Sequence, residues 1–119
     1  MMPDVDLQNT YWKLVVLGNE PVAVEPTRRE PHLVLNLAEQ KMRGHGGCNH
    51  FVGTYDFDGD RLQLRPIAAS RIDCAGSMEQ EQRFLQVLHA TERFGISGEE
   101  LELFGPEGSL AHFRAVFLQ

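Results

Sequence analysis

The sequence has few cysteines, no basic run and no long hydrophobic stretch, and each shortage excludes a class of protein. Only two of its 119 residues are cysteine, so the chain is not a disulfide-rich scaffold. No apolar run approaches the ~20 residues that a membrane-spanning helix needs. Lysine and arginine together number 11 against 17 acidic residues, and the formal charge is −6. This balance argues against nucleic acid or an anionic membrane surface as the main partner, because both attract basic patches.

The remaining composition is that of a single globular domain. A chain of 119 residues with 42% hydrophobic and 24% charged residues can bury a core that does not depend on disulfides or metal ions for stability. It shows no repeat, low-complexity stretch or linker. We expect residues 1–9 to form a flexible N-terminal tail and residues 10–119 to form one domain.

The cellular compartment is left open by the sequence. The first residues are polar and acidic, and the sequence as written shows neither the basic nor the apolar region of a signal peptide. We therefore expect either a cytosolic protein or a mature portion whose leader has been removed. One pair of cysteines fits a periplasmic disulfide as well as two buried thiols.

Period-two alternation of apolar residues is the main structural signal. It is typical of strands with one buried face, as at Leu33, Leu35 and Leu37. Asp58-Gly59 predicts a hairpin turn with these two residues at its centre. The strands expected from these patterns lie at 11–17, 32–37, 41–45, 51–57, 61–64, 93–97, 100–104 and 110–117.

One segment has helical spacing. Phe84, Leu85 and Leu88 lie three and four residues apart, and Ser77 with Gln80 has the form of a capping box. We predict a single helix over 78–90. The fold class is therefore α+β: a strongly curved, barrel-like antiparallel sheet of about eight short strands with one helix packed across it.

The densest group of reactive side chains is the glycine-rich segment 44–50. His45, Cys48 and His50 with Cys74 are zinc-type ligands, but their spacing is wrong for a standard zinc knuckle. Cys48 as a nucleophile would need a histidine placed by the fold, and no protease signature is present. We expect no metal, no cofactor and no catalytic residue, and keep a thiol- or metal-dependent site at His45, Cys48 and His50 as the alternative.

Three further patterns are interpreted as structural or solvent-exposed features and not as functional sites. The glycines of 44–49 fail the spacing of a phosphate-binding loop and are expected to permit positive φ or close strand approach. The acidic residues of 56–60 fail the calcium-loop pattern, because Arg61 and Ile67 stand where Gly and Glu are needed. The carboxylates of 79–81 and 99–102 are expected to lie at the helix start and on solvent-facing surfaces.

The two cysteines allow two states. A disulfide between Cys48 and Cys74 would close a loop of 26 residues and stabilise the fold by roughly 3–4 kcal/mol in the chain-entropy model. The other state is two reduced, buried thiols. Export of the protein would favour the disulfide.

Several motifs, taken in order, resemble those of the META domain (HslJ-like) family over about residues 10–117. They include an opening Trp-x-Leu motif, a signature before and within the predicted 51–57 strand, a cysteine segment before the helix, and the helix itself. The matching residues are Trp12-Lys13-Leu14, Gly47-Cys48-Asn49-His50-Phe51-x-Gly53-x-Tyr55, Ala68 to Cys74, and Glu79 to Leu88. Arg71-Ile72-Asp73 departs from the family's pattern.

The resemblance implies a curved antiparallel sheet with one helix and no established enzymatic activity. It also implies association with heat shock, stress response or drug resistance at the bacterial cell envelope, with periplasmic or outer-membrane placement and lipoprotein-like relatives. We expect a monomeric binding module for an unknown protein, peptide or lipid, or a scaffold of an envelope complex. An aromatic face offers such a ligand a groove, unless it simply fills the core: Trp12, Phe51, Tyr55, Phe57 and Phe113.

Overall fold

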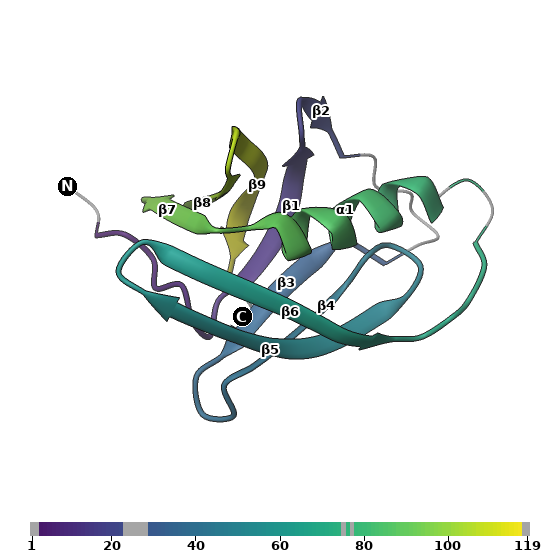
Figure 1. The fold of residues 1–119 in the computed structure, drawn as a ribbon, viewed down its shortest axis with the longest axis horizontal. Coiled ribbons are helices and arrows are strands. Elements are labelled where there is room, and N and C mark those ends of the chain that lie inside the picture. The colour runs from purple at the N-terminus through teal and green to yellow at the C-terminus, as the bar shows by residue number, and fades with distance from the viewer. Residues whose placement is uncertain (1–2, 23–28, 75, 77, 118–119) are drawn as a thin grey trace.

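The computed structural model of the chain describes residues 3–22, 29–74, 76 and 78–117. Within these residues the fold has nine strands and one helix (Figure 1). The elements are β1 (Tyr11–Leu17), β2 (Glu20–Pro21), β3 (His32–Asn36), β4 (Lys41–His45), β5 (His50–Asp58), β6 (Arg61–Ala69), α1 (Met78–Ala90), β7 (Arg93–Ser97), β8 (Glu100–Gly105) and β9 (Gly108–Val116).

All strand pairings are antiparallel, and the sheet closes on itself. Its order is β2-β1-β3-β4-β5-β6-β7-β8-β9, and β1 also pairs with β9. The pairing between β6 and β7 is short, with Arg61 opposite Arg93 as its registered pair. The sheet is therefore a strongly curved ring, in which β6 and β7 separate beyond this pair of residues.

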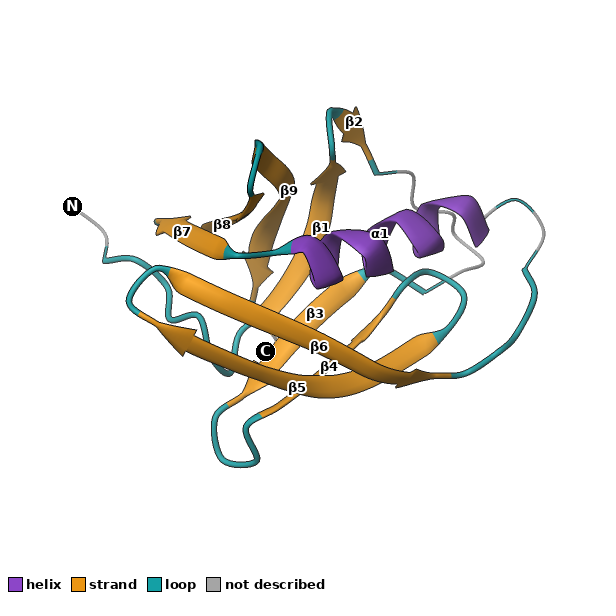
Figure 2. Ribbon diagram, viewed as in Figure 1, coloured by secondary structure: helices purple, strands orange, loops and turns teal. Residues whose placement is uncertain are grey.

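The helix completes the core of the ring. In Figure 2 α1 runs alongside β6. Its Phe84 is fully buried and lies between two aromatic rings of the sheet, 5.8 Å from Phe51 and 5.9 Å from Phe113 between ring centroids. Burying an aromatic side chain of this size contributes roughly 1.5–3 kcal/mol, so α1 is held mainly by this contact and by Leu88.

The sequence predicted this architecture well. The helix has the expected bounds, the fold class is confirmed, and Leu33 and Leu35 face the core as their alternation requires. The buried position expected for Leu37 is wrong, because β3 ends at Asn36 and Leu37 is 51% exposed. Ser77, the expected N-cap, lies outside the described residues. The ninth strand is β2, which was not predicted because it has two residues and one of them is proline.

Two details differ from the prediction at the β5–β6 hairpin. Asp58 pairs with Arg61, so the central turn residues are Gly59 and Asp60 rather than Asp58 and Gly59. Gly59 has φ +61°, which fits a turn with glycine at its first central position. In addition, β6 continues to Ala69, although the strand was expected to end at Leu64 and residues 66–76 to be irregular.

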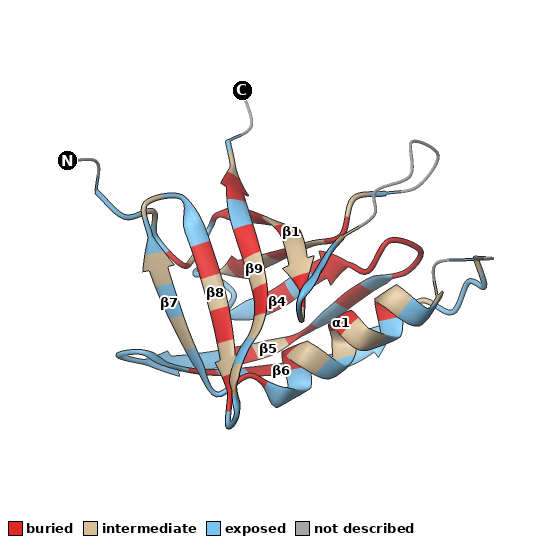
Figure 3. Ribbon diagram, turned by 90° about the horizontal axis from the view of Figure 1, so that it is seen from above, coloured by how far each residue is buried: buried red, intermediate tan, exposed pale blue. Residues whose placement is uncertain are grey.

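Residues 4–9, within the segment predicted to be a flexible tail, make defined contacts with the ring (Figure 3). Leu7 is buried and its carbonyl accepts a hydrogen bond of 3.0 Å from Nε1 of Trp12. The amide of Val5 donates to the carbonyl of Gly98, and the amide of Gly98 donates to Asp4. The ordered contacts of the domain thus begin before residue 10.

Candidate functional site

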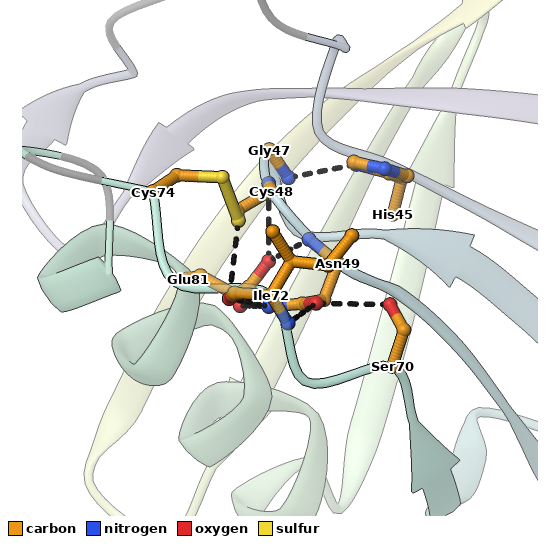
Figure 4. The surroundings of a disulfide bond; sticks show 8 residues. All are labelled: His45, Gly47, Cys48, Asn49, Ser70, Ile72, Cys74 and Glu81. Atoms are coloured by element: carbon orange, nitrogen blue, oxygen red, sulfur yellow. Dashed lines mark hydrogen bonds between the residues drawn. A yellow bond between two sulfur atoms is a disulfide. The ribbon is translucent and has the colours of Figure 1, made fainter.

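The signature loop between β4 and β5 is tied to the helix by a buried carboxylate. Oε1 of Glu81 accepts hydrogen bonds from the backbone amides of Cys48, at 3.1 Å, and Asn49, at 2.6 Å. Its Oε2 accepts a bond of 2.8 Å from Nδ2 of Asn49 (Figure 4). Glu81 is 4% exposed, so the solvent-facing role expected for this residue is wrong. The signal that was missed is its spacing, because Glu81, Phe84 and Leu88 share one helical face.

Asn49 connects the same loop to the segment that follows β6. Its Oδ1 accepts from the hydroxyl of Ser70 at 2.9 Å and from the amide of Ile72 at 2.6 Å. Its Nδ2 also donates to the carbonyl of Ile72 at 2.9 Å. Together with the bond to Glu81, these contacts use both ends of the buried amide (Figure 4). Such a satisfied network fixes a loop, and it leaves Asn49 no polar atom for a ligand.

The two cysteines are joined beside this network. The sulfur atoms of Cys48 and Cys74 are 2.05 Å apart and their Cα atoms are 5.9 Å apart (Figure 4). In this state neither sulfur is a thiolate, so neither can act as a nucleophile or bind zinc. The disulfide and the Glu81–Asn49 network connect the same two segments of the chain.

Two glycines of the signature have backbone roles. Gly47 has φ +114°, in the region that side chains rarely adopt. Gly53 lies where β5 and β6 approach closely, and a Cβ there would collide with the carbonyl oxygen of Arg65. The role of Gly47 agrees with the positive φ expected for the glycines of 44–49, whereas Gly53 lies outside that prediction.

Three histidines lie in register across β3, β4 and β5. His32 is opposite His45, and His45 is opposite His50. The ring of His32 stacks on Tyr11 at 4.3 Å and lies 6.4 Å from the ring of His45, between centroids. Burial lowers the pKa of both His32 and His45, which keeps these two rings neutral near pH 7.

The arrangement of these side chains gives the metal hypothesis no support. Nδ1 of His45 accepts a bond of 3.0 Å from the amide of Gly47, and Cys48 is in the disulfide. In the part of the chain that the structure describes, no group of three histidine, cysteine or carboxylate side chains is arranged to hold a metal. Cys48, Asn49 and the ring of His45 are thus engaged in contacts within the fold.

Most of the aromatic residues considered for a groove fill the core instead. Trp12, Phe51, Tyr55 and Phe113 are each at most 4% exposed. The groove hypothesis is wrong for these four side chains. Phe57 differs, because it is 42% exposed and contacts Phe94 edge-on at 6.2 Å between centroids.

Phe57 borders a hollow of about 790 Å³ at the opposite end of β5 from the signature loop. We call this hollow the end groove. It lies between the N-terminal segment, the ends of β3, β5 and β7, and the residue after β9. Its lining consists of residues 4–10 together with Leu37, Phe57, Phe94, Ile96 and Phe117.

Three large apolar side chains of the end groove are exposed. Phe117 is 61% exposed, Leu37 51% and Phe57 42%. Sequence reasoning missed this groove because its lining comes from five separate parts of the chain. A second hollow, of about 560 Å³, also borders Phe57 and is lined by residues 61–63 of β6 and by residues 91–93.

No described helix is long and apolar enough to cross a membrane.

The chain was compared with known families, curated proteins and solved structures. The family model of the META domain matches residues 5–116. No curated protein matches at a significant level. An NMR structure of a protein from Burkholderia xenovorans is similar in fold, with a TM-score of 0.77 and 21% identity, over 94% of this chain and 85% of that one. A second NMR structure has a TM-score of 0.69 and 19% identity, with 90% of each chain covered.

Proposed function

The chain belongs to the META domain family, and from this premise we propose that it is a non-enzymatic binding module with a stress-associated role at the bacterial cell envelope. The observation that carries the proposal is the end groove, where large apolar side chains remain exposed beside a hollow of about 790 Å³. Contiguous exposed apolar surface on a soluble domain is typical of a binding site.

The state of the signature residues supports a role without catalysis. Cys48 is in a disulfide, and Glu81 and Asn49 are engaged in bonds within the fold. A nucleophile or general base needs a free polar group that substrate can reach. In residues 46–49, the described loop between β4 and β5, no side chain offers such a group.

The disulfide also supports placement in the envelope. Structural disulfides persist in oxidising compartments such as the periplasm and are rare in the cytosol. We propose that the protein acts as a monomer in the periplasm or at the outer membrane, where its ligand is a protein, a peptide or a lipid.

A complementation experiment tests the proposed function. A strain lacking this gene is grown under heat and envelope stress, and the gene is restored as wild type, Phe57→Ser or Ile67→Ser. Ile67 is 70% exposed and does not line the end groove, so it is the matched control. We expect wild type and Ile67→Ser to restore growth and Phe57→Ser to fail, with all three proteins equally stable. Equal growth of the two variants, or no growth defect in the deletion strain, would contradict the proposal.

A further inference from the structure

The end groove combines apolar and acidic surface. Its exposed apolar side chains are Leu37, Phe57 and Phe117, with Phe94 and Ile96 partly exposed between them. Asp4 and Asp6 line the same hollow and are exposed. Among the described residues that line it, none is lysine, arginine or histidine.

The two aspartates are available to a ligand. One oxygen of Asp4 accepts the amide of Gly98 at 2.8 Å, and among the described residues no cation pairs with either carboxylate. The formal charge of the whole chain is −6, the same sign as that of the two carboxylates. Opposite charge on a ligand would speed its approach and fix its orientation.

We propose that the end groove binds a cationic amphipathic peptide segment, in which lysine or arginine residues alternate with large apolar ones. The apolar residues would pack on Phe57, Leu37 and Phe117, while the cations would lie beside Asp4 and Asp6. This inference rests on the proposed function and names the ligand of the same groove.

The charge of the groove disfavours two other occupants. A fatty acid or an anionic headgroup would place its negative charge beside the two aspartates, and like charges repel. A second copy of the chain would bring together two acidic grooves on molecules that each carry a formal charge of −6. Charge complementarity thus selects the cationic peptide.

The test is a binding titration with two synthetic peptides. One is a short fluorescein-labelled peptide of alternating lysine and leucine, and the other has glutamate in place of every lysine. Binding is followed by fluorescence anisotropy at low and high salt. We expect the lysine peptide to bind, with an affinity that falls as salt rises, and the glutamate peptide not to bind.

Four variants locate the site. Phe57→Ser should weaken binding about tenfold, the loss that accompanies an aromatic side chain left unburied. Asp6→Asn should weaken binding about threefold and reduce its salt dependence. The matched controls are Ile67→Ser, exposed and apolar, and Glu79→Gln, exposed and acidic; neither lines the groove. Both should bind as the wild type does.

Every other outcome overturns the proposal. If the groove variants and the control variants lost equal affinity for the lysine peptide, the peptide would be attracted by the net charge of the protein alone. Absence of binding, preference for the glutamate peptide, or self-association in place of peptide binding would exclude the cationic ligand. If the lysine peptide fails while Phe57→Ser still abolishes complementation, the ligand class is wrong and the binding function stands. If the lysine peptide does not bind and Phe57→Ser complements as the wild type does, the proposed binding function is wrong as well.

Discussion

At the scale of single residues, Glu81 links the helix to the loop in which the signature begins. A carboxylate at this position accepts three hydrogen bonds from the loop that holds Cys48 and Asn49. The family signature begins in that loop, and the loop is bonded to a residue of the helix 32 positions away from Asn49. Sequence reasoning identified the loop residues but not their acceptor, because it placed Glu81 in solvent by its charge instead of by its helical face.

Replacing the carboxylate by an amide tests this role. Glu81→Gln keeps the shape but turns one acceptor into a donor, which then opposes either Nδ2 of Asn49 or the two loop amides. We expect the free energy of unfolding to fall by about 1–3 kcal/mol, the penalty for buried donors left unpaired. Urea unfolding measures it, with exposed Glu79→Gln as the control. A loss no larger than that of the control would show that the network does not hold the loop.

The buried histidines make stability depend on pH. The pKa values of His32 and His45 in the folded protein lie below the ordinary value of 6.5, mainly because of burial. As pH falls through 6.5, the unfolded chain therefore takes up protons before the folded one does. The stabilisation from the neutral rings is complete above about pH 6.5 and declines below it.

This pH dependence is measured as the change in unfolding free energy between about pH 7.5 and about pH 5.5. The groups that face His45 are Arg29, His32 and His50, which disfavour its protonation, and Glu81, which favours it. We expect His45→Gln to flatten the dependence relative to wild type, and exposed His89→Gln to leave it unchanged. If the unfolding free energy of His45→Gln changed with pH as much as that of the wild type, His45 would not be a source of the pH dependence.

At the scale of elements, the helix and strands were predictable where local spacing determined them. The helix α1 has the bounds that its apolar spacing indicated, and β1, β4 and β7 likewise match the predicted ranges. The two-residue β2 was missed because it exists only through its pairing with β1. The turn of the β5–β6 hairpin was displaced by one residue because register is set by cross-strand packing as well as by the Asp-Gly pair.

The disulfide joins two elements, the β4–β5 loop and the segment entering α1. Because it closes a loop of 26 residues, we expect its removal to lower the free energy of unfolding by roughly 3–4 kcal/mol. Urea unfolding with and without reductant measures this loss. Thiol titration of the unfolded protein without reductant should find no free thiol. Two free thiols, or the same stability in both conditions, would mean that Cys48 and Cys74 are reduced in the native protein.

At the scale of the whole molecule, β5 lies between the signature loop and the end groove. The signature loop precedes its first residue, His50, and the end groove begins at Phe57 near its last. Nine residues of strand place these two regions roughly 26 Å apart. The fold could be predicted because its signals are local, whereas the groove could not, because it is assembled from segments far apart in the sequence.

The central claim is that ligands bind at the end groove and that the signature loop only stabilises the fold. An NMR titration of the isotope-labelled chain with the lysine–leucine peptide tests this most directly, because it reports on every backbone amide. We predict the largest shift changes at Asp6, Leu37, Phe57, Phe94 and Ile96, with little change at Cys48 and Asn49. The largest changes at Cys48 and Asn49, or changes spread evenly over the surface, would contradict the account.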